Sequence, residues 1–142
     1  MLVLFMALET TLMIESEIPV NMTCADDVGI EKGAILLLSD PNTAATTTGD
    51  ADECAGICAS EKIAGNGVTS VSVYRGGTFK GYAGLAGVTA GHAIITDTAT
   101  GAANELVDAD VNSEQIVGIA LETATDGETF LFELKPMAVN LA

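Results

Sequence analysis

The amino-acid sequence predicts an all-β protein built from two similar β units, with an extended arm at its N-terminus. Three observations support this prediction. Apolar residues make up 49% of the chain but aromatic residues only 4%, so the apolar content is mostly aliphatic. The 15 glycines and the many threonines fit short β-branched strands joined by tight turns. The third observation is a short sequence motif that occurs twice.

The repeated motif predicts an aliphatic strand that begins at a glycine, then an acidic turn, then a second strand that begins at a glycine. Its copies match at Gly33 and Gly91, at Asp50 and Asp108, and at Gly56 and Gly118. The first two pairs are 58 residues apart and the third is 62 apart, so the second copy carries a four-residue insertion. A solenoid needs about three repeats or more. Two copies therefore predict two small β units packed face to face.

The domain organisation follows from the repeat. We expect an extended arm over residues 1–25 and a single β domain over residues 26–142. The domain is expected to contain two repeat-like halves, at about residues 26–82 and 83–135, and then a short C-terminal tail. A chain of 142 residues is long enough for one such domain with a real core.

The arm opens with an apolar run, residues 1–8, that Glu9 ends. The run has no basic flank, as a signal peptide would, and it is too short to span a bilayer; Met6 offers an alternative translation start. From there to Ile14 apolar and polar residues alternate, which predicts a strand, and Pro19 ends it or places it at a sheet edge. An ordered apolar arm packs against its own domain or against a neighbouring chain, and both readings stay open.

The first half is expected to hold three strands, and the glycines around them to form turns. The strands are expected at Ala34–Leu38, Ala55–Ala59 and Val68–Tyr74. We expect Gly76-Gly77 to form a two-residue hairpin turn after the third strand, because a Gly-Gly pair supplies positive φ angles. The glycine-rich stretch 81–87 is expected to link the halves, which then share a core.

The second half is expected to repeat this pattern with strands at Ala93–Thr96 and Val117–Leu121. Asp126-Gly127 predicts a hairpin, followed by a strand that turns Phe130, Phe132 and Leu134 inward. Residues 105–113 are compatible with a single helical turn. Seven glycines in the two halves are assigned to structural turns: Gly33, Gly56, Gly76, Gly77, Gly91, Gly118 and Gly127.

The net charge of −15 comes from 20 acidic residues against five lysines and arginines. Nucleic-acid binding needs clustered basic residues for phosphate contacts, so we expect no nucleic-acid partner. An acidic chain is also repelled by anionic lipid, so we expect no membrane partner. Two readings of the excess acid remain: a solvated surface, which the scattered acids favour, or a partner with a basic face.

The sequence offers no catalytic constellation, and we expect no enzyme, no cofactor and no metal. His92 is the only histidine, and no nucleophile or orienting acid can be assigned to it, so we expect a structural or exposed role. The acidic loops supply oxygen ligands suited to Ca²⁺ or Mg²⁺ but lack the EF-hand pattern, so turn-forming acids are expected. These loops contain Asp50, Asp52, Glu53, Asp108 and Asp110.

Cys24, Cys54 and Cys58 are an odd number of cysteines, which does not indicate a disulfide framework. A C-x3-C pair without further cysteine or histidine ligands is a poor zinc site. We expect all three to be small buried hydrophobic residues.

The order of these segments resembles a known family. It runs through Gly33-Ala-Ile-Leu, Gly56-Ile-Cys-Ala, the strand 68–73, Gly91-His-Ala-Ile-Ile-Thr-Asp, Ile116-Val-Gly-Ile-Ala-Leu-Glu and the strand 127–134. Over residues 26–135 this order resembles the capsid decoration (cement) proteins of tailed viruses known as the DUF2190 family. The resemblance implies a β-barrel or β-tulip, made in the host cytoplasm, that sits on the outside of a head built from HK97-type coat subunits. It also implies a homotrimer, the major capsid protein as partner, and no catalytic residues.

Capsid or neighbour contacts are expected in the pieces that the two copies do not share. They are Leu2, Val3, Leu4, Phe5, Leu8, Leu12, Ile14, Tyr74, Phe79 and Tyr82. The leading hypothesis is a decoration protein on the capsid exterior that stabilises capsomer contacts. The alternative is a β-barrel module that binds a ligand or glycan, through Tyr74, Phe79 or Tyr82, on the virion or cell surface.

Overall fold

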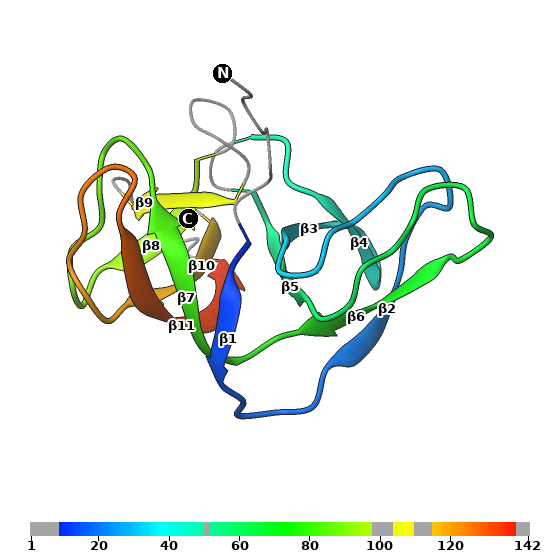
Figure 1. Ribbon diagram of the computed structural model, residues 1–142, viewed down its shortest axis with the longest axis horizontal. Coiled ribbons are helices and arrows are strands. Elements are labelled where there is room, and N and C mark those ends of the chain that lie inside the picture. Colours follow the sequence, from blue (N-terminus) through cyan, green and yellow to red (C-terminus); the bar gives the residue numbers. More distant parts are fainter. Residues whose placement is uncertain (1–8, 50–51, 98–103, 110–114, 139–142) are drawn as a thin grey trace, which may run out of the picture.

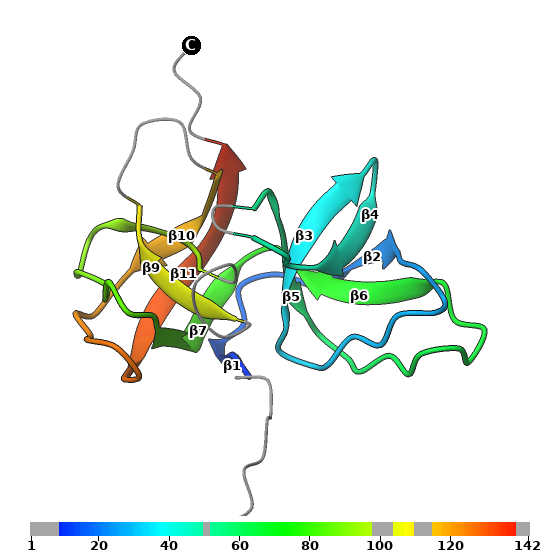
Figure 2. The same cartoon turned by 90° about the horizontal axis from the view of Figure 1, so that it is seen from above.

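The computed structural model describes residues 9–49, 52–97, 104–109 and 115–138. Within these ranges the chain forms eleven β-strands and no helix, which confirms the all-β prediction. The strands form two closed barrels that lie side by side, as Figures 1 and 2 show from two directions.

Each barrel is a ring of five consecutive strands. Barrel 1 is closed in the order β2-β4-β3-β5-β6, and barrel 2 in the order β7-β9-β8-β10-β11. The strands of barrel 1 are β2 (Val20–Thr23), β3 (Ile35–Asp40), β4 (Thr43–Thr46), β5 (Cys54–Cys58) and β6 (Ser70–Tyr74). Those of barrel 2 are β7 (Gly77–Ala83), β8 (Ala93–Thr96), β9 (Glu105–Asp108), β10 (Gln115–Ala120) and β11 (Thr129–Ala138). The remaining strand, β1 (Thr11–Ile14), lies on β7 outside the ring of barrel 2.

The two rings have the same connectivity. The first and third strand of each ring pair in parallel, β2 with β4 and β7 with β9, and every other ring pair is antiparallel. The turns also agree: the N–H of Gly33 donates to the Cys58 carbonyl at 2.9 Å, and that of Gly91 to the Ala120 carbonyl at 2.7 Å. Both glycines have a φ near +85°, at 82° and 86°. The predicted pair of similar β units is confirmed.

Gly56 and Gly118 occupy equivalent places where neighbouring backbones cross closely. A Cβ on Gly56 would collide with the carbonyl oxygen of Tyr74, and a Cβ on Gly118 with that of Glu133. The register shifts beside both glycines, as expected at a bulge. These two glycines therefore allow close strand packing inside the sheet, where a turn was predicted.

One buried cluster spans both barrels, as predicted for halves that share a core. Ile35, Cys54 and Ile57 of barrel 1 pack in the same buried cluster as the aromatic residues of barrel 2. Phe130, Phe132 and Leu134 point inward from β11 as expected, each at most 2% exposed. The rings form a continuous stack in which Tyr74 meets Phe79, Phe79 meets Phe132 and Phe132 meets Phe130. The rest of barrel 1 has a core of smaller residues, among them Cys24, Ala55 and Cys58.

The prediction of a hairpin at Gly76-Gly77 is wrong. β6 and β7 do not pair, and they belong to different barrels, so Arg75 and Gly76 are the link between the copies. The stretch 81–87, predicted as the link, begins inside β7. Gly77 has a φ of 119°, and a Cβ there would lie 2.9 Å from the carbonyl oxygen of Ile14, so its lack of a side chain lets β1 approach β7.

Two further segments differ from their expected structure. Residues 105–108, expected in a helical turn, form β9 instead, because they complete barrel 2 between β7 and β8. Residues 20–23, expected in the arm, form β2 and close barrel 1 against β6. The division into an arm and one domain stays a prediction.

All three cysteines are buried and free, as expected. Burial raises the pKa of the Cys54 thiol to about 12. Burial also raises the pKa of Cys58, whose thiol donates to the Ser60 carbonyl at 2.9 Å. The thiols of Cys54 and Cys58 are therefore packing groups that stay protonated at neutral pH.

Candidate interaction surface

Residues 10–14 tie the two barrels together; we call them the strap. Thr10 lies against barrel 1, where its N–H and its hydroxyl both donate to the Gly33 carbonyl, at 3.2 and 2.5 Å. A side chain on Gly33 would collide with Thr10, so this glycine provides the docking place as well as a turn. The next residues form β1, and Leu12 pairs with Phe79 of β7 in barrel 2. The strap thus binds barrel 1 through a turn and barrel 2 through a sheet.

The strap and the segment after it expose apolar side chains. Leu12 packs on the shared core, whereas Met13 is 53% exposed and Ile14 62%. Ile18, before Pro19, is 82% exposed. Single exposed apolar residues are common, but three within six positions of one short segment mark a surface suited to contact with another protein.

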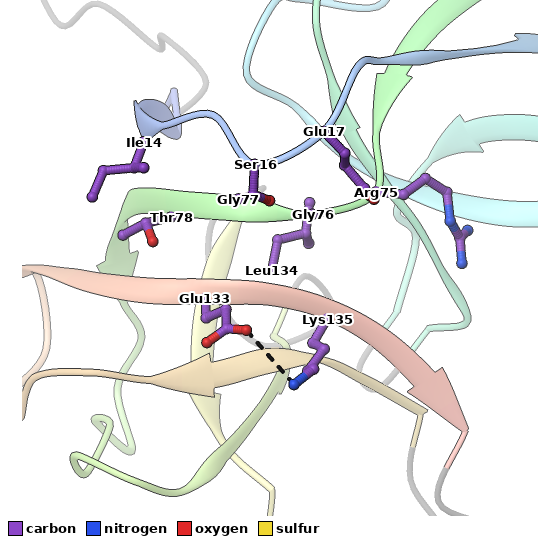
Figure 3. A pocket seen from close by; sticks show the side chains of 10 residues that line it. All are labelled: Ile14, Ser16, Glu17, Arg75, Gly76, Gly77, Thr78, Glu133, Leu134 and Lys135. Carbon is purple, nitrogen blue, oxygen red and sulfur yellow. Dashed lines mark ion pairs between the residues drawn. The ribbon is translucent and has the colours of Figure 1, made fainter.

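A groove runs along the seam between the barrels on one side of the strap, and Figure 3 shows the side chains that line it. It has a volume of about 280 Å³ and collects residues from the strap end, the inter-barrel link and β11. Its charged residues are balanced: Glu17 and Glu133 against Arg75 and Lys135. In a chain of net charge −15 such a balanced patch meets little repulsion from another acidic surface.

The charges of the seam groove are only weakly tied to one another. Lys135 and Glu133 form an ion pair at 3.6 Å with about half of each side chain exposed, which contributes about 0–1 kcal/mol to stability. The Arg75 guanidinium donates from Nη1 to the Ala55 carbonyl at 2.8 Å. Lys135 and Glu133 therefore stay accessible to a partner, whereas Arg75 is engaged with barrel 1.

A second groove, of about 300 Å³, lies on the other side of the strap, between β1 and barrel 1. Thr11, Leu12, Lys32 and Tyr74 are among its lining residues. Burial, the charge of Glu15 and a hydrogen bond to it raise the pKa of Tyr74, so this phenol stays protonated and donates to Glu15, the residue after the strap.

The expected contact residues fall into four groups. Leu12, Ile14 and Tyr74 gather around the strap. Phe79 does not belong with them as a contact: it is 1% exposed and sits in the aromatic stack, because β7 turns its odd-numbered residues into barrel 2. Tyr82 is half-buried at the far end of β7, opposite Thr129. The other five lie outside the described residues: Leu2, Val3, Leu4, Phe5 and Leu8.

The sequence did not single out Thr10, Met13, Arg75 or Lys135, which also build this surface. For Met13 the only indication of a surface position in the sequence is that it lies in an apolar pair, Met13-Ile14, directly before the acidic Glu15. Arg75 and Lys135 line the same groove only in the folded chain, and nothing in their local sequence marks them.

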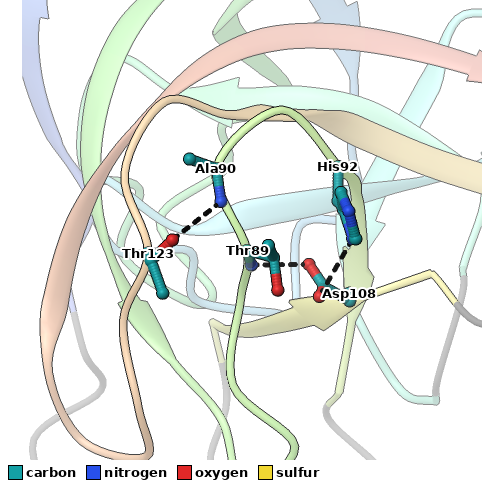
Figure 4. Close-up of polar contacts among 5 residues, drawn as sticks. All are labelled: Thr89, Ala90, His92, Asp108 and Thr123. Atoms are coloured by element: carbon teal, nitrogen blue, oxygen red, sulfur yellow. Dashed lines mark hydrogen bonds and ion pairs between the residues drawn. The ribbon is translucent and has the colours of Figure 1, made fainter.

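His92 lies in a turn at one end of barrel 2, and Figure 4 shows its polar neighbours. Its Nδ1 is 3.3 Å from Oδ2 of Asp108, and Oδ1 of Asp108 accepts the N–H of Thr89 at 2.9 Å. The Ala90 N–H donates to the Thr123 hydroxyl at 3.1 Å. The contacts hold the turn together, and the imidazole itself is 60% exposed.

In the described part of the acidic loops, two aspartate side chains accept hydrogen bonds from backbone N–H groups of nearby turns. Asp52 accepts hydrogen bonds from the N–H groups of Thr48 and Gly49 at 2.8 and 3.0 Å, and Asp108 accepts one from the N–H of Thr89. Among the described residues, no group of three or more His, Cys, Asp or Glu could hold a metal ion. Asp50 and Asp110 lie outside them. No helix in the described ranges is long and apolar enough to cross a membrane.

Comparison with solved structures finds a similar fold in a virus particle. The chain is similar to the N base of the head fiber gp8.5 of bacteriophage phi29, with a TM-score of 0.54 and 14% sequence identity. The match covers 83% of this chain and 93% of that one. The match shows the fold. Both barrels therefore have a counterpart in a known structure.

No family model and no curated protein matches the chain. The resemblance to the DUF2190 family accordingly stays a prediction. At 14% identity, no residue role is carried over from the head fiber base.

Proposed function

We propose that this protein is a virion structural protein that decorates the outer surface of a tailed-virus head. It binds the major capsid protein, stabilises contacts between capsomers, and has no enzymatic activity. The observation that carries the proposal is the fold match over nearly the whole head fiber base, a protein named as part of a phage head. A head built from HK97-type subunits, a homotrimeric state and membership of the DUF2190 family are the finer parts of the same proposal.

The physical character of the chain supports this role. Two closed rings leave few strand edges open to wrong pairing, which suits a protein displayed at high local density. The acidic surface keeps such a protein soluble and away from the genome. Basic residues are few, and Lys62 is buried with Nζ donating to the carbonyls of Asp26 and Val28 at 2.8 Å.

Attachment is proposed through the strap and the seam groove beside it. Ile14 and Met13 supply exposed apolar area, worth on the order of 25 cal/mol for each Å² buried. Arg75 and Lys135 supply cations in an otherwise acidic chain. Where several linked copies bind one head, these weak contacts act together, and the overall binding is stronger than that of a single copy.

The test is to add the purified chain to heads that lack it and to measure bound protein by sedimentation and by electron microscopy. We expect saturable binding at a fixed set of positions and heads that resist heating better. The double variant Ile14→Asp with Arg75→Glu should bind more weakly, while Leu85→Asp, at a residue 81% exposed and away from the strap, should bind normally. Absence of saturable binding by the unaltered chain would refute the proposal.

The glycan-binding alternative has less support from the structure. Tyr74 packs on Phe79 and is held by Glu15, Phe79 is buried, and Tyr82 lies at the other end of β7. These three rings therefore do not form one exposed aromatic platform. Glycan-array binding that disappears in Tyr82→Ala would reverse this ranking.

A further inference from the structure

The connection between β5 and β6 contains the exposed sequence Gly65-Asn66-Gly67, which has no part in the proposed attachment surface. Asn66-Gly67 is the one place in the sequence where a glycine follows an asparagine. Gly67 has a φ of 85°, and its surroundings are open, because a Cβ there would meet nothing within 4 Å. Without a side chain at Gly67, nothing on that residue blocks an approach of its backbone nitrogen to the side chain of Asn66.

The carboxylate of Asp26 lies against that backbone nitrogen. Oδ1 of Asp26 accepts a hydrogen bond from the N–H of Gly67 at 2.7 Å. A general base must lie within about 2.6–3.2 Å of the atom whose proton it takes, and Asp26 meets this condition. Its carboxylate is therefore placed to accept the amide proton of Gly67 as the nitrogen becomes a nucleophile.

A hydrogen-bond donor lies on the side-chain carbonyl that such a nucleophile would attack. The N–H of Val68 donates to Oδ1 of Asn66 at 3.0 Å. Attack on Cγ of Asn66 moves negative charge onto Oδ1, and a fixed N–H at this distance stabilises the oxyanion as it develops. The turn thus supplies a nucleophile, a base and an oxyanion donor around one side-chain amide.

A buried network fixes Asp26 relative to the turn. The backbone carbonyl of Asp26 accepts the Gly65 N–H at 2.7 Å and Nζ of Lys62 at 2.8 Å. Lys62 is only 4% exposed, and its Nζ also donates to the Val28 carbonyl at 2.8 Å. Holding the base and the turn in one place removes much of the entropic cost of bringing the reacting groups together.

We propose that Asn66 is a self-modification site, at which the folded chain deamidates its own side chain with Asp26 as the base. A bond forms between the Gly67 nitrogen and Cγ of Asn66, and the bond from Cγ to Nδ2 breaks. Ammonia leaves with the proton that Asp26 took from Gly67, and a cyclic imide remains. Water then opens the imide at one of its two carbonyls and gives aspartate or isoaspartate at position 66. The reaction needs no oxidant, no reductant and no cofactor.

The reaction changes the turn that carries it out. The imide nitrogen has no hydrogen, so the bond from Gly67 to Asp26 is lost in the intermediate. The product then carries a second carboxylate in the turn that binds Asp26, and like charges at close range repel. Isoaspartate in addition lengthens the main chain by a methylene group. The inference does not rest on the proposed function, because the reaction needs only the folded chain and water.

The test follows each asparagine by mass spectrometry while the purified full chain is kept at neutral pH. Asn66 lies on a tryptic peptide of its own, residues 63–75, and the change from amide to acid is read from its mass. Enzymatic methylation identifies isoaspartate. We expect Asn66 to convert at least about tenfold faster in the folded chain than in the chain unfolded in guanidinium chloride at the same pH and temperature. The exposed Asn21 and Asn42 are internal controls and should convert more slowly than Asn66.

Two matched variants test the base. Asp26→Asn keeps an oxygen that accepts the Gly67 N–H but removes the carboxylate, so Asn66 should convert at least about tenfold more slowly. Asp27→Asn removes the same charge from the next, exposed residue and should leave the rate unchanged. Asn66→Gln should give no product on this timescale, because its attack would need a larger ring. Melting temperatures show which variants are folded.

The inference is overturned if Asn66 converts no faster in the folded chain than in the unfolded one. It is also overturned if folded Asp26→Asn converts at the unaltered rate. Should Asp26→Asn fail to fold, the comparison of the folded and unfolded unaltered chain still decides, because it needs no substitution.

Discussion

Asn104 of barrel 2 accepts a hydrogen bond from the backbone N–H of Ile35 in barrel 1, at 2.9 Å between Oδ1 and N. Both residues are buried, at 4% and 1% exposed. The amide stands directly before β9 with a φ of 71°, a conformation that asparagine tolerates better than most residues. This bond joins the barrels beside their shared core.

Replacing Asn104 with alanine should therefore loosen the two barrels. The Ile35 N–H would lose its acceptor inside the protein, which costs about 1–3 kcal/mol of unfolding free energy. Urea denaturation measures this. The matched control is Asn42→Ala, because Asn42 also has a positive φ, of 52°, but is exposed. Equal losses in the two variants would show that backbone strain, and not the bond between barrels, accounts for the effect.

Gly118→Ala should destabilise the chain by about 3 kcal/mol or more, because the new methyl group collides with the Glu133 carbonyl and the backbone must shift. Gly56→Ala should behave alike at the equivalent place in barrel 1. Gly91→Ala is the control: its φ is 86° but its surroundings are open, so it should lose only about 1–2 kcal/mol. Thermal melting distinguishes the two classes, and a mild Gly118→Ala would argue against the tight crossing.

The buried thiol of Cys54 predicts a loss of stability at high pH. Its pKa is about 12 in the fold against 9.0 for the free group, so the folded state keeps a proton that the unfolded state releases. Stability is then complete below pH 9 and falls by about 1.4 kcal/mol per pH unit between pH 9 and about 12. Cys54→Ala should make that slope shallower when unfolding is measured at several pH values, and the raised pKa values of Cys58 and Tyr74 account for what remains. An unchanged slope would show that Cys54 does not contribute to it.

Two truncations should separate attachment from folding. Removing residues 1–8 is expected to leave the melting temperature unchanged and to lower head occupancy. Removing residues 1–14 takes away Thr10 and β1 as well. The core residues on which Leu12 packs then become exposed to solvent, so the melting temperature should also fall. If the chain without residues 1–8 decorates heads at full occupancy, the proposed role of the arm in attachment is contradicted.

Much of the fold could be predicted because its signals are local. The alternation of Phe130, Phe132 and Leu134 placed them on the inward face of a strand, and the structure agrees. The repeated Gly33 and Gly91 marked equivalent turns with nearly equal φ. A period of two and a glycine with positive φ each depend on a few neighbouring residues, so they can be read without knowing the rest of the chain.

The candidate surface could be predicted only in part. Ile14 was expected as a contact residue and is 62% exposed, but the alternating pattern of the arm would have placed it on the same face as Leu12, which packs on the core. The register shift between Leu12 and Ile14 separates the two, and local sequence does not show that shift. Phe79 was expected among the contact residues because residues 74–82 have no counterpart in the other copy, but it is buried inside barrel 2. The seam groove is lined by Arg75 and Lys135, which come from two elements far apart in sequence, and no local pattern predicts that they line one groove.

The sequence by itself determined that the protein is a duplicated, all-β and strongly acidic chain, because composition, charge and repeats do not depend on how strands pair. Only the tertiary structure decided where one barrel ends and the next begins. Gly77 is compatible with a hairpin turn or with a close approach between strands, and local sequence does not distinguish them. The choice was made by Ile14, whose backbone lies against Gly77 once β1 has paired with β7, and that contact exists only in the folded chain.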